Sequence, residues 1–131
     1  MTTTFVQANQ GVQFLKHILR ERYDEFIEQF DLDILDMSHG GKCVLGQLDA
    51  FLKGIPMGTG SFASYSVFTH PMSHGELIDL GFTVETPDTM GFVEGKRMFA
   101  SLTATWALLI TSEKERIDSG KLSTTVSATR P

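Results

Sequence analysis

The sequence predicts a compact, mainly α-helical single domain of three or four helices, with at most one small β element between residues 55 and 86. Two stretches, 12–30 and 92–117, carry apolar side chains every three or four residues. The chain has 131 residues, 41% hydrophobic and 21% charged, which is ordinary for one globular domain. We therefore expect one helical domain over residues 1–118, followed by a flexible Ser/Thr-rich tail at 119–131.

The first helix is predicted over residues 12–30, "VQFLKHILRERYDEFIEQF", with Asn9 as its N-cap. Charged residues of both signs occupy the face opposite the apolar stripe, which predicts a solvated surface there. The stripe consists of Leu15, Leu19, Tyr23, Phe26 and Phe30.

The second helix is predicted over residues 42–53, after the acidic link "DLDILDMSHGG". The two glycines of that link oppose one continuous helix, and Gly54 supplies a stop. Gly46 lies inside the helix, where glycine costs about 1 kcal/mol relative to alanine. Its presence therefore predicts the close approach of a neighbouring element.

Two further helices are predicted in the second half of the chain. "SHGE" at 73–76 is a capping-box pattern and indicates a short helix that ends near Gly81. Residues 82–85 could form a short strand. The last helix covers 92–117, ends in the solvated "SEKER", and buries a stripe that consists of Phe99, Leu102, Trp106, Leu109 and Ile110.

Composition excludes several classes of partner and compartment. Sixteen acidic against eleven basic residues give a net charge of -5, and the basic residues are scattered, which argues against nucleic-acid binding. No apolar run is long enough for a membrane span. A single cysteine and an N-terminus without a basic, apolar leader predict a cytoplasmic protein.

Four potential zinc ligands occur as two pairs with i,i+4 spacing. Zinc prefers nitrogen and sulfur donors in a tetrahedron, and this spacing would bring each pair together on a helix. The local sequence opposes it, because Gly40 and Gly41 interrupt the first pair and Pro71 follows the first residue of the second. We therefore predict no metal or other cofactor, with a zinc site as the alternative. The four residues are His39, Cys43, His70 and His74.

Cys43 also allows a thiol-enzyme hypothesis, with His39 as the base and a helix N-terminus lowering the thiol pKa. No sequence feature marks an oxyanion hole or an orienting group. We therefore predict that Cys43 is a small buried core residue and that the protein is not an enzyme.

Residues 54–70 combine turn residues with aromatic and β-branched residues at uneven spacing, and the segment "SFASYSVFTHPM" at 61–72 has no polar face of its own. Exposed aromatic side chains often dominate protein interfaces. The predicted partner-binding residues are Phe62, Tyr65, Phe68 and Met72.

The run "LDILDMSHGGKCVLGQL" resembles a segment of small uncharacterised proteins of actinobacteria and their phages, in which an acidic leucine run leads into Cys-Val-Leu-Gly-Gln, here residues 43–47. A later "Leu-Thr...Trp" pattern is similar to Leu102, Thr103 and Trp106. The resemblance covers about 12–54 and 92–112, and the histidines are not part of it. It implies a non-enzymatic phage or prophage protein that contacts a bacterial host protein or self-associates as a homo-oligomer.

Overall fold

The computed structural model describes residues 2–61, 73–84 and 91–129, and helices are the only regular secondary structure among them. The predicted fold class, a mainly α single domain, is confirmed. The first three elements are consecutive in sequence, and together they count as one of four helical units. The elements are α1 (Thr2–Leu19), the 3-10 turn η1 (Arg20–Arg22), α2 (Tyr23–Gln29), α3 (Val44–Lys53), α4 (His74–Asp79) and α5 (Phe92–Thr129).

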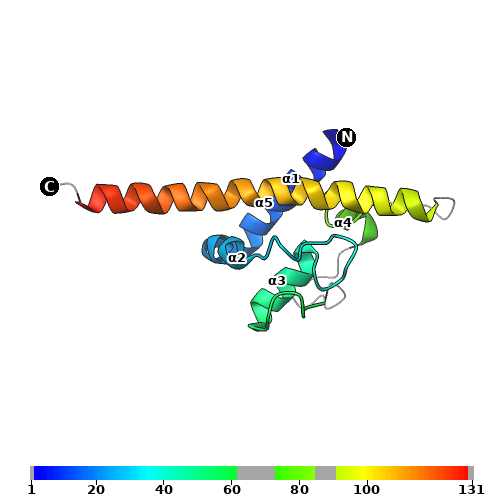
Figure 1. Ribbon diagram of the computed structural model, residues 1–131, viewed down its shortest axis with the longest axis horizontal. Helices are drawn as coiled ribbons and strands as arrows, with labels where there is room; N and C mark the ends of the chain where they lie inside the picture. Colours follow the sequence, from blue (N-terminus) through cyan, green and yellow to red (C-terminus); the bar gives the residue numbers. More distant parts are fainter. Residues whose placement is uncertain (1, 62–72, 85–90, 130–131) are drawn as a thin grey trace.

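The long helix α5 sets the length of the molecule (Figure 1). Its 38 residues correspond to about 57 Å. It contacts both α1 and α2, and α1 crosses it (Figure 1). The last turns of α5 project beyond the other helices. The hydrophobic core lies between the inner face of α5 and the other helices.

The first helix starts earlier than the sequence predicts. We expected it to begin near residue 12 with Asn9 as N-cap, but α1 begins at Thr2 and Asn9 lies inside it. Its early turns are stabilised by packing, since Ala8 is fully buried and a Cβ on Gly81 would meet its backbone. The predicted single helix is also interrupted, because Arg20 has a φ of 51° and η1 separates α1 from α2.

The second predicted helix is confirmed as α3. Gly54 ends it with a φ of 71°, a conformation that favours glycine. A Cβ on Gly46 would collide with the backbone of Gly40 and Gly41, so the predicted close approach is real. Loops cover α3 so fully that every residue from Val44 to Phe51 is buried.

The predicted capping box is present at the start of α4. The Ser73 hydroxyl accepts a hydrogen bond from the Glu76 amide at 3.2 Å, and the Glu76 carboxylate accepts one from the Ser73 amide at 3.2 Å. Gly81 follows with a φ of 71°. The short strand expected at 82–85 does not form over its described residues, 82–84, because the Phe82 side chain turns into the core instead.

The predicted inner stripe of α5 is confirmed, with Leu102, Trp106 and Ile110 all at most 1% exposed. The Trp106 Nε1–H donates to the Gly81 carbonyl oxygen at 2.6 Å, and its ring stacks on Phe82 at a centroid distance of 5.7 Å. Gly11 leaves room for this ring, since a Cβ there would lie 2.8 Å from it. The indole therefore joins α1, α5 and the turn after α4.

The predicted end of this helix near residue 117 is wrong, because α5 continues to Thr129. Gly120 weakens a helix without ending it, and no proline occurs between Phe92 and Thr129. Flexibility of the tail stays a prediction. Among the described residues, no helix combines the length and the apolar character that a membrane crossing requires.

We expect Trp106→Ala to lower the free energy of unfolding by about 3–5 kcal/mol, because it removes a fully buried ring and its hydrogen bond. Leu108→Ala is the matched control on the same helix, since Leu108 is 70% exposed, and it should change stability by less than about 0.5 kcal/mol. Urea denaturation followed by circular dichroism measures both. Equal losses would contradict the assigned orientation of α5.

Two glycines inside helices should respond oppositely to alanine. Gly46→Ala should destabilise the protein by more than about 1 kcal/mol, because the new methyl group collides with backbone. Gly95→Ala meets no atom within 4 Å and should stabilise α5 by up to about 1 kcal/mol. Thermal unfolding of the two variants tests this, and a stabilising Gly46→Ala would refute the close approach.

Candidate functional site

The loop before α3 is fixed from inside by Gln47, which is fully buried. Its side-chain oxygen accepts from the Asp31 amide at 2.8 Å, and its Nε2 donates to the carbonyl oxygens of Asp31 and Lys42, both at 3.1 Å. One amide side chain thus satisfies both ends of the loop, and it places Cys43 at the start of α3.

Cys43 is the N-cap of α3 and is 2% exposed. Its Sγ accepts a hydrogen bond from the Gly46 amide at 3.3 Å and donates to the Gly40 carbonyl oxygen at 3.6 Å. Burial raises the thiol pKa more than the backbone hydrogen bonds lower it. The prediction that Cys43 belongs to the core is confirmed, and a raised pKa disfavours the thiolate that a nucleophile needs.

Of the four potential zinc ligands, His39 and Cys43 have side chains that the structure describes. The Nδ1 of His39 accepts from the Gly41 amide at 3.1 Å and so closes its own turn. His70 and the side chain of His74 lie outside the described part of the structure. Within the described residues, no group of three or more His, Cys, Asp or Glu side chains could hold a metal ion.

A small hollow of about 150 Å³ lies beside this turn, between His39, Cys43, Phe82 and Phe99. The thiol forms part of its wall but presents almost no surface to it. The wall combines these side chains with those of Met37, Ser38 and Thr83. Among the described residues that line it there is no carboxylate to orient the imidazole.

The predicted partner-binding residues Phe62, Tyr65, Phe68 and Met72 all lie outside the described residues, and their role stays a prediction. The described surface offers a different site on α5.

The outer face of α5 is the side opposite its buried stripe. Leu108 and Val93, at 70% and 61% exposed, are more exposed than any other large hydrophobic residue for which burial is described. The helical repeat places them along one line with small and charged residues. We call this line the outer face; it consists of Val93, Arg97, Ala100, Ser101, Ala104, Leu108, Thr111 and Glu115, all exposed.

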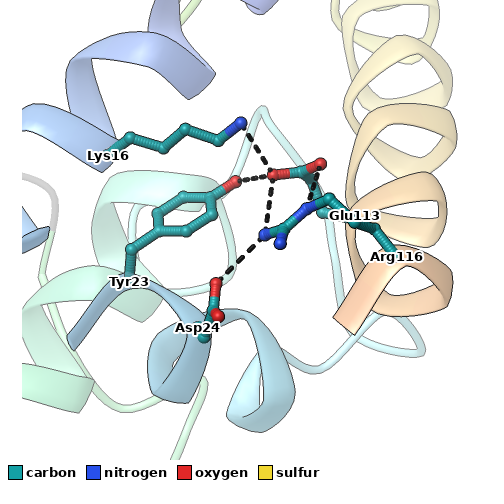
Figure 2. A network of polar contacts seen from close by, with 5 residues as sticks. All are labelled: Lys16, Tyr23, Asp24, Glu113 and Arg116. Carbon is teal, nitrogen blue, oxygen red and sulfur yellow. Dashed lines mark hydrogen bonds and ion pairs between the residues drawn. The ribbon is translucent and has the colours of Figure 1, made fainter. Parts of the chain in front are cut away.

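A polar network holds the C-terminal half of α5 so that this face points away from the body. Figure 2 shows its five residues, which come from α1, α2 and α5: Lys16, Tyr23, Asp24, Glu113 and Arg116. The Tyr23 hydroxyl donates to the Glu113 carboxylate at 2.8 Å, and Lys16 lies 3.2 Å from the same oxygen. Arg116 lies 3.2 Å from the other Glu113 oxygen and 3.0 Å from Asp24 (Figure 2).

Glu113 is the centre of this network, with a side chain only 14% exposed. Burial alone would raise its pKa, but the hydrogen bonds from Tyr23, Arg116 and Lys16 outweigh burial, and the pKa is lowered. Burial, together with the hydrogen bond to Glu113, raises the pKa of Tyr23 far above its ordinary value.

Sequence reasoning missed this network, since it placed "SEKER" and the charges of the first helix in solvent. One signal was available: Tyr23 occupies a core position of the apolar stripe, and a buried hydroxyl requires a polar partner.

We expect a bulky thiol reagent to modify native Cys43 several orders of magnitude more slowly than the denatured chain, because the thiol is buried and its raised pKa reduces the thiolate. Stopped-flow labelling with and without denaturant measures the ratio. Similar rates in both states would remove Cys43 from the core.

Stability should fall at alkaline pH because of Tyr23. The unfolded state loses the tyrosine proton near pH 10, whereas the folded state retains it, so the unfolded state binds fewer protons and stability falls with rising pH. The loss can approach about 1.4 kcal/mol per pH unit above that value. Urea unfolding between neutral and alkaline pH should show a shallower loss for Tyr23→Phe, although this variant is about 1 kcal/mol less stable at neutral pH. If the free energy of unfolding falls equally steeply with pH in both proteins, Tyr23 does not cause the alkaline loss of stability.

Comparison with known proteins adds no relative: no family model, no curated protein and no solved structure matches this chain.

Proposed function

We propose that the protein acts without catalysis, by binding another protein through the outer face of α5. The observation that carries this proposal is the 70% exposure of Leu108 in the middle of the longest helix. Leu108 belongs to an exposed apolar row with Val93, Ala100 and Ala104, and such a row on a rigid helix offers a contact surface.

The attachment of α5 supports this proposal. The core side chains and the Glu113 network use the inner face, so the outer face is presented on a helix whose rotation is fixed. A preorganised surface loses less conformational entropy on binding than a mobile one.

The surroundings of Cys43 favour a binding role over the alternative of a thiol or zinc enzyme. The thiol is buried, its pKa is raised, and the nearby imidazole is hydrogen-bonded to backbone. The net charge of -5 favours a protein over a nucleic acid as the partner.

The resemblance to proteins of actinobacteria and their phages extends the proposal. It favours a phage or prophage accessory protein that works in the bacterial cytoplasm, with either a host protein or a second copy of the chain as its partner. The outer face is the surface that we assign to this contact.

Capture from an actinobacterial lysate tests the role of this surface. The tagged wild-type chain should retain a partner that Leu108→Asp loses, because a buried unpaired carboxylate is costly at an interface. Ile55→Asp is the matched control, since Ile55 is exposed on the loop after α3, and it should retain the partner. If wild type and Leu108→Asp retain the same proteins in the same amounts, the outer face is not the contact surface.

A further inference from the structure

On the basis of the function proposed above, we propose that the partner of the outer face is a second copy of this chain, with the two α5 helices antiparallel and Ala104 of each opposite Leu108 of the other. The small residue leaves room for the large one. Since a two-fold axis repeats each contact, this single pairing gives two complementary Ala–Leu contacts.

The charges on the outer face fit the same register. Arg97 lies seven residues before Ala104, and Glu115 lies seven residues after Leu108. Seven residues are close to two helical turns, so all four lie along one line of the helix. In the antiparallel pair each Arg97 therefore faces the Glu115 of the other copy.

A parallel arrangement lacks this complementarity. In the same face-to-face contact it would place Arg97 against Arg97 and Glu115 against Glu115, and like charges in register are destabilising. The charge pattern thus favours an antiparallel pair of helices. It also favours a second copy as the partner, because the opposite charges lie at equal distances on either side of the midpoint of the face.

Arg97 and Glu115 are exposed, and they point away from the network that uses Glu113 and Arg116. The next charged pair outward consists of Glu94 and Asp118, which share a sign. Because successive residues are 100° apart around the helix axis, each of these side chains lies about 60° to one side of the contact line. The two lie on opposite sides of it, so they do not meet across the interface.

The expected dimer is weak. The outer face extends over about 33 Å of helix, and the area buried by one such helix pair falls below about 1,200 Å² in total, at the low end of specific interfaces. Association should therefore depend on protein concentration in the micromolar range.

Sedimentation velocity over a concentration series, with charge-reversal variants of the full chain, tests the arrangement. Arg97→Glu and Glu115→Arg should each weaken association about tenfold or more, since each converts two ion pairs into two repulsions. The double variant restores opposite charges at both contacts and should associate within a few-fold of wild type. Glu21→Arg, the same charge reversal at an exposed residue outside α5, should leave association unchanged.

The outcomes separate this inference from the function on which it rests. Rescue by the double variant supports antiparallel pairing. A wild-type chain that stays monomeric at every concentration, or single reversals without effect, overturns it. If the wild-type chain stays monomeric but Leu108→Asp no longer captures a protein from the lysate, the outer face is a contact surface and its partner is not a second copy. Circular dichroism of each variant verifies that it is folded.

Discussion

The fold depends on the burial of the Trp106 indole where α1, α5 and the turn after α4 meet. Its one polar atom is satisfied by the Gly81 carbonyl oxygen, and its ring fits because Gly11 has no side chain. Rotation or sliding of α5 would either expose the ring to water or leave its N–H without a partner inside an apolar core. This constraint fixes the angular position of α5, and with it the direction in which Leu108 points.

Much of the fold could be predicted from the sequence, because helical periodicity reports burial directly. The inner stripe of α5, the limits of α3 and the capping box of α4 are each encoded within a few neighbouring residues. The start of α1 and the break at Arg20 were not predictable in this way. The start of α1 depends on contacts with Gly81 and Trp106, which are distant in sequence, and tertiary packing overrides local signals there. No local pattern marks the positive φ of Arg20.

The site shows the same division. Burial of Cys43 followed from its position at the head of an apolar helix, whereas the ion pairs of Glu113 did not, because Tyr23 lies 90 residues away along the chain. The amphipathic pattern of α5 separates its inner side from its outer side. It does not show whether a charged side chain belongs to a contact surface or to an internal network, because that depends on how exposed the side chain is. Arg116 and Glu115 are adjacent in sequence, and only the first joins that network.

Trp106 is the only tryptophan of the chain, and this gives the molecule a built-in fluorophore at its helix junction. An indole stacked on Phe82 and shielded from water emits at shorter wavelength than a hydrated one. Its emission will therefore report the undocking of α5 from α1. Since the indole faces inward, the same signal should stay silent when a ligand covers the opposite side of the helix, so that loss of the helix junction and occupancy of the outer face can be observed separately.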